Sequence, residues 1–245
     1  MSTSTESVLQ TIDPSRCNSV PESLNHRSAP ARPVIEPDLL SFHRLSPRRT
    51  GVLDLPLLGS AYQCWSDVWR ETFAELEGRT ELCSDDFTRQ EEISALFHGY
   101  QCIALFFSRT VDLSNPIARD DSYFSVWPEA TRQAACAHGS RVWVSSNITI
   151  HRDWRRPANC SLSRLICALI MERFLISDAD VLVGTMRNDR RMNTVTYELG
   201  AKPLACDVIH HGVPVDLVAF YRAECVRTTL DPDTEALVQA LRPRD

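Results

Sequence analysis

Residues 142–186 read VWVSSNITIHRDWRRPANCSLSRLICALIMERFLISDADVLVGTM, and this stretch decides the fold. β-Branched side chains are frequent over Val142–Ile150 and predict a strand. Apolar residues then recur at helical spacing from Leu162 to Phe174, and Asp180–Met186 has the pattern of a second buried strand. Two strands that are joined through one helix by such short connections form a parallel, right-handed crossover.

The loop between the first strand and the helix, His151–Cys160, is rich in arginine. In a crossover of this kind, the carboxyl ends of the strands and the N-terminus of the helix face one crevice. Backbone N–H groups and the helix dipole favour an anion there, and either Asn159 or Ser161 can cap the helix. The loop therefore predicts a site for a phosphate-bearing cofactor. The alternative is an ordinary surface loop that carries arginines.

This loop resembles the pyrophosphate loop of the GNAT superfamily of acyl-coenzyme A N-acyltransferases. That loop follows the pattern R/Q-x-x-G-x-G/A, often within a run like V-H-P-E-Y-R-G-K-G-I-G, and Ile150–Cys160 is similar to this run. Like or similar residues stand at His151, Asp153, Trp154 and Arg155, and small residues stand at the two glycine positions, Ala158 and Cys160. The chain departs from the pattern because its loop contains no glycine.

A second motif of the superfamily, N…Y-x-x-L-G-F/A, is similar to Asn188 and Tyr197–Ala201. Here Tyr197 lies three residues before Gly200, where the superfamily usually has four. The resemblance implies an α/β fold with a mixed central sheet, helices on both faces and two splayed parallel strands. It implies a single GNAT-like domain over residues 45–245. Residues 1–44 are rich in Ser, Thr, Pro and Asn, and we expect a disordered arm there.

The remaining elements are predicted from apolar periodicity and from caps. Helices are expected over Ser60–Glu77, from Asp85 or Asp86 through Phe97, and over Pro128–His138, Asp189–Leu199 and Asp231–Leu241. Strands are expected over Tyr100–Val111 and Asp121–Val126, and a hairpin is expected from Cys206–Ile209 and Val213–Tyr221.

The resemblance also assigns roles to individual residues. The acyl donor, acyl-coenzyme A or acyl-phosphopantetheine, would lie between the splayed strands. Its phosphates would lie on Arg155, Arg156, Ala158, Asn159, Cys160 and Ser161. Asn188 would contact the pantetheine, or it would only cap the following helix. Tyr197 would protonate the leaving thiolate, or it would be a buried structural tyrosine.

The first strand offers no carboxylate as a general base, so a water relay is the default hypothesis. His151, at the end of that strand, is the side-chain candidate, because imidazole is a common general base; the alternative is a plain loop residue. Arginines gather after both strands, and this rim would suit coenzyme A phosphates or the acidic face of an acyl carrier protein. They are Arg152, Arg155, Arg156 and Arg164 in the first group and Arg187, Arg190 and Arg191 in the second.

The glycine-free loop and the large apolar front half resemble one branch of the superfamily, the long-chain N-acyl amino acid synthases and acyl-homoserine lactone synthases. This resemblance implies transfer of an acyl group, from coenzyme A or acyl carrier protein, to the amine of a small molecule such as an amino acid. Two alternatives stay open. One is a catalytically silent domain that binds an acyl thioester. The other is a thiol enzyme that uses Cys160, since a helix N-terminus lowers a thiol pKa.

Composition narrows the class of protein further. The chain has 245 residues, of which 43% are hydrophobic, so it can bury a substantial core. A net charge of −6 argues against a nucleic-acid binder. No apolar run has membrane-spanning length, and no signal peptide is evident. The nine cysteines form no C-x-x-C pair, which favours a reduced, cytoplasmic protein.

No metal is expected, because Cys206, His210 and His211 match no established ligand spacing. Lys202 is the only lysine among 26 basic residues. This bias indicates a GC-rich genome, which we interpret as bacterial.

Overall fold

Seven strands form one mixed sheet in the order β1-β2-β3-β4-β5-β7-β6. This computed structural model describes residues 32–49, 51, 54–225 and 230–241. The strands are β1 Leu40–Leu45, β2 Glu92–His98, β3 Gln101–Asp112, β4 Arg141–Ile150, β5 Val181–Arg187, β6 Lys202–His210 and β7 Val213–Tyr221. The helices are α1 Leu55–Glu77, α2 Asp85–Thr88, α3 Glu129–Ala135, α4 Leu162–Ile176, α5 Met192–Glu198 and α6 Pro232–Leu241. All neighbouring strands are antiparallel except β4 and β5, whose parallel crossover through α4 confirms the prediction.

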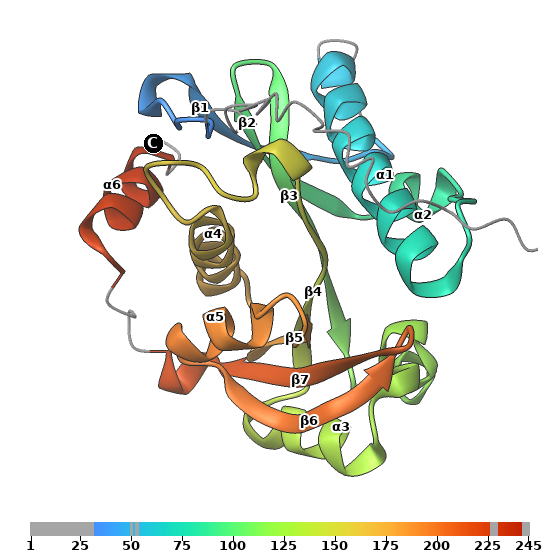
Figure 1. Cartoon of the computed structure of the whole chain (residues 1–245). Coiled ribbons are helices and arrows are strands. Elements are labelled where there is room, and N and C mark those ends of the chain that lie inside the picture. Colours follow the sequence, from blue (N-terminus) through green and yellow to red (C-terminus); the bar gives the residue numbers. More distant parts are fainter. Residues whose placement is uncertain (1–31, 50, 52–53, 226–229, 242–245) are drawn as a thin grey trace, which may run out of the picture. The chain divides into compact units, whose positions relative to one another are not determined.

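Helices cover both faces of the sheet, as predicted (Figure 1). On one face, α4 buries Leu165, Ile166 and Phe174, and α5 and α6 pack beside it. On the other face, Trp65 of α1 and Phe87 of α2 pack on β2 and β3. The segment from Leu113 to α3 covers the same face over β4, β5 and β7. Because adjacent strand residues point to opposite faces, each inner strand contributes to two cores.

Two predicted elements are wrong. The helix expected to run through Phe97 is only α2, and Glu92–His98 is the strand β2. Ile93, Leu96 and Phe97 have helical spacing, but this short run is buried on both faces, as in a central strand. The strand expected over Asp121–Val126 is a 3-10 helix, η4 (Ser122–Val126), because Asp121 accepts a hydrogen bond from the backbone of Tyr123 and caps a turn.

The expected boundary at residue 44 is also wrong for the part of the arm that the structure describes. Residues 40–45 form β1, which pairs with β2 from Leu40–His98 to Leu45–Ile93. Alternating Phe42 and His43 face opposite sides of the sheet, so this segment has the period of a strand. Residues 1–31 of the predicted arm lie outside the described residues.

Candidate active site

β4 and β5 separate shortly after they begin to pair. Their parallel pairing comprises Val142–Val181, Trp143–Leu182 and Val144–Val183. β4 then continues to Ile150 against β3, and β5 continues to Arg187 against β7. The facing edges of the two strands therefore make no ladder with each other beyond Val144. This geometry confirms the predicted splay.

A β-bulge bends β4 inside this opening. Asn147 has a φ of +52°, and the register of β4 with β3 shifts at the same place. Two tryptophans of α1 hold the bulge. Trp65 Nε1 donates to Asn147 Oδ1 at 3.2 Å, and Trp69 Nε1 donates to Thr149 Oγ1 at 3.0 Å. Helix α1 therefore fixes the shape of β4 along the opening.

An apolar pocket lies between β4, β5 and α4. It is lined by Ser145, Ile148, Cys167, Ile170, Met171, Leu182, Val183, Gly184, Met186, Thr196 and Phe220. Gly184 makes room for a neighbouring side chain, because a Cβ built there would lie 2.2 Å from Met186 Cε. Ser145 is 2% exposed, and its Oγ has no hydrogen-bond partner among the described residues.

A buried carboxylate, Asp216 of β7, organises the side chains that follow β5. Its Oδ1 accepts from Asn188 Nδ2 at 3.0 Å and from the backbone N–H of Asp207 at 2.9 Å. Its Oδ2 accepts from Asn193 Nδ2 at 2.9 Å and from the Tyr197 hydroxyl at 2.6 Å. Asn188 Oδ1 is buried and has no partner in the part of the chain that the structure describes.

This cluster sets the protonation of two groups. Burial acts to raise the pKa of Asp216, but the hydrogen bonds from Tyr197, Asn193, Asp207 and Asn188 outweigh it and lower the pKa to about 2. Burial, and then the hydrogen bond to Asp216, raise the pKa of Tyr197 far above its ordinary value. Tyr197 therefore holds its proton against Asp216. The predicted role of Tyr197, protonation of the leaving thiolate, stays a prediction, and in this structure its hydroxyl donates to Asp216 Oδ2.

The predicted phosphate loop is partly occupied by the chain itself. The backbone N–H of Ala158 donates to Pro33 O at 2.8 Å. The Asn159 side chain accepts from the Ile35 N–H at 2.9 Å and donates to Ile35 O at 2.7 Å. These groups of the loop are thus engaged, and a phosphate has fewer N–H donors there than the resemblance implies.

Three other residues of the predicted phosphate site, Arg155, Arg156 and Ser161, lie on this loop and at the start of α4. Ser161 caps α4, because its Oγ accepts from the Arg164 N–H at 3.4 Å. Arg156 is exposed, and Arg155 Nη2 lies 3.7 Å from Glu71 Oε2 of α1. Exposed ion pairs of this kind contribute roughly 0–1 kcal/mol, so a phosphate can compete with Glu71 for Arg155.

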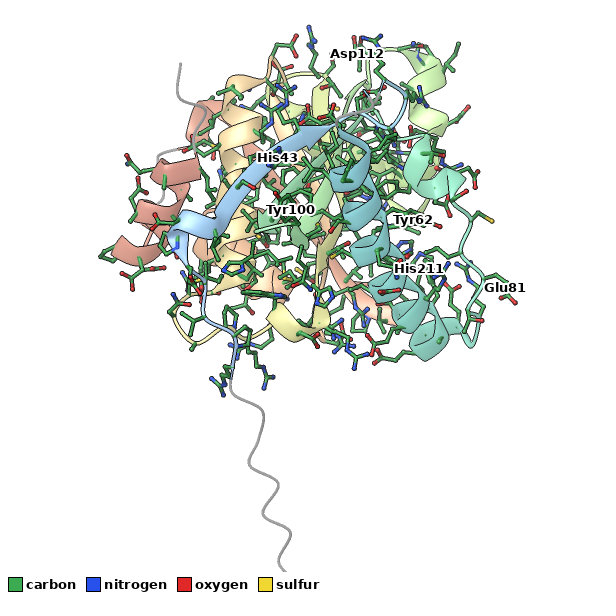
Figure 2. The ribbon with its side chains drawn as sticks, turned by 90° about the horizontal axis from the view of Figure 1, so that it is seen from above. His43, Tyr62, Glu81, Tyr100, Asp112 and His211 are labelled. Atoms are coloured by element: carbon green, nitrogen blue, oxygen red, sulfur yellow. The ribbon has the colours of Figure 1, made fainter. Side chains whose placement is uncertain are left out.

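Helix α1 brings the predicted arginine groups to one rim. Glu71 pairs with Arg155 from the loop after β4, and Glu75 pairs with Arg190 from the loop after β5, at 2.7 Å. The tip of the β6–β7 hairpin reaches the same helix, and Figure 2 shows its His211 beside α1. His211 pairs there with Glu77. Both loops and the hairpin therefore surround the opening between β4 and β5.

His151, the predicted base, lines a second pocket of about 300 Å³ between α1 and the loop after β4. Its side chain is 18% exposed, and its Nδ1 accepts from the Asp153 N–H at 3.3 Å. Arg70, Glu71 and Arg152 share this pocket, so it is polar and charged, unlike the apolar pocket under β4 and β5. His151 and Tyr197 consequently belong to different pockets or clusters.

The thiol of Cys160 does not have the environment of a nucleophile. Burial raises its pKa to about 11, and the nearby charges of Asp231 and Asp233 add to this effect. Burial and these two charges outweigh the effect of the helix dipole on the Cys160 thiol, on which the thiol-enzyme hypothesis rested.

We predict that iodoacetamide at pH 7 alkylates Cys160 roughly 100-fold more slowly than exposed Cys83, because Cys160 is partly buried and its raised pKa leaves it almost entirely as the thiol. Mass spectrometry of the two peptides over time measures both rates in one sample. Cys160→Ala should also leave acyl-transfer activity within a factor of about three. Equal alkylation rates, or loss of activity in the variant, would restore the thiol-enzyme hypothesis.

Sequence reasoning missed three residues of the site. Asp216 is the only charged residue of the β7 sequence VPVDLVAFY, and that isolated charge was the available signal. Asn193 gave no signal. Ser145 is one of four polar residues in the second half of its strand, with Ser146, Asn147 and Thr149, and nothing in the sequence distinguishes it from them.

In the part of the chain that the structure describes, no group of three or more His, Cys, Asp or Glu side chains could hold a metal. No helix of the described residues is long and apolar enough to cross a membrane.

A splayed β4–β5 pair, a capped α4 behind it and helices on both faces make this the GNAT-like fold. Solved structures of acyl-transferring enzymes share it. FeeM, an N-acyl amino acid synthase from uncultured soil microbes, matches with a TM-score of 0.53 and 14% identity over 78% of this chain and 94% of its own. BjaI is a coenzyme A-dependent acyl-homoserine lactone synthase solved with SAM and isopentyl-CoA. It matches with a TM-score of 0.53 and 14% identity over 82% of this chain and 88% of its own.

The mosquito protein named arylalkylamine N-acetyltransferase like 5b matches with a TM-score of 0.52 and 8% identity over 74% of this chain and 99% of its own. No protein-family model matches the sequence, and no curated protein matches it either. The likeness to these structures is therefore one of fold.

Proposed function

We propose that the chain is an N-acyltransferase that moves an acyl group from a pantetheine thioester to the amine of a small molecule, such as an amino acid. The separation of β4 and β5 after Val144–Val183 carries this proposal. It leaves backbone donors and acceptors on the facing edges, and the amides of an extended pantetheine arm can pair with them. The activities named for FeeM, BjaI and the mosquito enzyme support the same reaction class.

The reaction makes few chemical demands on the protein. A neutral amine attacks the thioester carbonyl carbon, the oxyanion needs a hydrogen-bond donor, and the departing thiolate gains a proton. β4 carries no carboxylate beyond Val144, so a water relay accepts the proton of the amine. His151 is the side-chain candidate for that relay, because it lines the charged pocket beside α1.

For the donor we propose a carrier with a single phosphate, an acyl carrier protein, in preference to coenzyme A. Pro33 and Ile35 engage the Ala158 N–H and the Asn159 side chain, so the loop offers less to a pyrophosphate. Arg155, Arg156 and Ser161 would bind the one phosphate, and Asn188 Oδ1 would accept from the pantetheine arm. BjaI is described as coenzyme A-dependent, so acyl-coenzyme A stays the alternative donor.

A silent domain that binds an acyl thioester is the second candidate function. One observation favours it: the Tyr197 hydroxyl, the expected proton donor, is bonded to Asp216. We propose a cytoplasmic location for either function, because all eight cysteines of the described residues are free thiols.

The test is thiol release from a panel of donors, from acetyl-coenzyme A to long-chain acyl carrier protein, against amino acids and other amines. We expect release that requires both a donor and an amine, with faster release from acyl carrier protein. Equal rates with acetyl-coenzyme A would contradict the proposed donor. No release from any pair, in folded protein that binds a donor, would leave the silent domain as the function.

A further inference from the structure

Ser145 is the first residue of β4 after the strand leaves β5. Val144, the residue before it, still pairs with Val183, and no residue of β5 pairs with Ser145 itself. On its other side, Ser145 pairs through the backbone with Ser108 of β3. The residue therefore stands where the opening between the two parallel strands begins.

The Ser145 hydroxyl faces an apolar wall. Apart from Thr196, the side chains that line this pocket are aliphatic, aromatic or sulfur-containing. The hydroxyl is buried, and among the described residues it has no hydrogen-bond partner. Thr196, the other hydroxyl, donates to Asn193 O at 2.9 Å within its own helix.

An unsatisfied buried hydroxyl destabilises a fold, and native structures contain few of them. An alanine at this position would fill the strand without that penalty. Packing therefore does not account for the hydroxyl, whereas a ligand that brings a hydrogen-bond acceptor into the opening does.

We propose that the Ser145 Oγ–H donates a hydrogen bond to the carbonyl oxygen of the donor thioester, and that Ser145 is a catalytic residue of the transfer. This inference rests on the proposed function. As the amine nitrogen bonds to the carbonyl carbon, the C=O π pair moves to oxygen, and the Ser145 hydrogen bond stabilises that oxyanion. When C=O re-forms, the C–S bond breaks and sulfur leaves with the electron pair. The proton lost by nitrogen passes to water and then to sulfur, which gives an amide and a thiol.

The surrounding groups fit this division of roles. The Tyr197 hydroxyl donates its proton to Asp216, so it is already engaged and Ser145 supplies the hydroxyl donor without a partner. Gly184 lies on β5 one residue beyond Val183 and lines the same pocket, where the Met186 side chain occupies the space that a Cβ would need. The apolar wall excludes water, which strengthens a hydrogen bond to a developing charge.

The first test compares Ser145→Ala with the unsubstituted chain. We expect kcat to fall by about 10²-fold, the usual effect of removing one oxyanion donor, while KM for the donor changes less than threefold. The unfolding midpoint should stay equal or rise, because an unsatisfied hydroxyl is removed. Ser108→Ala is the matched control: Ser108 is 4% exposed and stands across from Ser145 on the far side from β5. Unchanged kcat in Ser145→Ala, or an equal fall in Ser108→Ala, would overturn the inference.

The second test needs no amine. Octanoyl-acyl carrier protein and octanoyl-coenzyme A, labelled with ¹³C at the thioester carbonyl, are bound to the full chain and observed by infrared spectroscopy. We expect the carbonyl stretch to lie at lower frequency in the unsubstituted chain than in Ser145→Ala, with Ser108→Ala unchanged. Identical frequencies would overturn the role of Ser145. If the carbonyl frequency differs as expected but no amine-dependent turnover is found, the Ser145 hydrogen bond would be upheld and the proposed transferase activity overturned. Failure of both thioesters to bind would overturn both.

Discussion

Asp216→Ala should lower the free energy of unfolding by about 3–4 kcal/mol, because four donors lose their common acceptor inside the protein. Asn188, Asn193, Tyr197 and the Asp207 N–H would be left buried or half-buried without the carboxylate. Urea titration measures the loss. Asp178→Asn, at an exposed carboxylate paired with Arg141, should change the same quantity by less than about 1 kcal/mol.

The cluster around Asp216 also makes the stability of the fold decrease at acid pH. The pKa of Asp216 is about 2 in the folded chain and about 3.9 in an unfolded one, so the charged form favours folding. Its contribution, about 2–3 kcal/mol, is fully present above about pH 5 and is lost as the pH falls through the folded pKa of about 2. Asp216→Ala should therefore flatten the dependence of stability on pH in this window. A loss below about 1 kcal/mol at pH 7, or an unaltered acid limb, would contradict the view that Asp216 organises the cluster.

Arg222→Ala should destabilise the protein by a similar amount, about 3–4 kcal/mol. The guanidinium donates to four backbone carbonyls at the end of α4 and in the turn that leads to β5. They are Phe174 O at 2.7 Å, Leu175 O at 2.9 Å, Ser177 O at 3.0 Å and Ala179 O at 2.6 Å. The positive charge also lies at the C-terminus of a helix, where the dipole favours a cation, and 4.8 Å from the Phe174 ring centroid.

Arg222→Lys separates geometry from charge. An ammonium group keeps the charge but lacks the planar fork, so we expect it to recover less than half of the loss. Arg89→Ala removes an exposed arginine that pairs with Asp86 and should cost less than about 1 kcal/mol. Thermal and urea unfolding of the three variants measure these losses of stability. Full stability of Arg222→Lys would show that the charge of Arg222 suffices without the guanidinium geometry.

The crossover could be predicted because its signals are local. Strand, cap and helix each depend on residues close in sequence, and Ser161 caps α4 as one of the two expected candidates. β2 could not be predicted from spacing, since Ile93, Leu96 and Phe97 fit a helix as well as a doubly buried strand. Its type is decided by pairing with β1 and β3, which the local pattern does not contain.

The site was predictable in place but not in detail. Its position follows from the carboxyl ends of β4 and β5, as the parallel crossover requires. The contact of Ile35 with Asn159 joins residues 124 positions apart, and nothing near Asn159 announces it. The cluster around Asp216 likewise combines β7 with two segments that follow β5. The one signal in the sequence is the single charged residue, Asp216, within the otherwise uncharged sequence of β7.

The sheet consists of two halves that are each continuous in sequence. β1 to β4 form one half and β5, β7 and β6 form the other, and within the sheet they are joined only by the short ladder from Val142–Val181 to Val144–Val183. We expect this ladder to act as a hinge. The gap between β4 and β5 beyond this ladder can widen or narrow while every antiparallel ladder stays intact. A bulkier ligand in the gap would therefore strain few hydrogen bonds of the sheet. Amide hydrogen exchange at Val144 and Val183 would register that movement directly, as the first protons to lose protection when the halves turn apart.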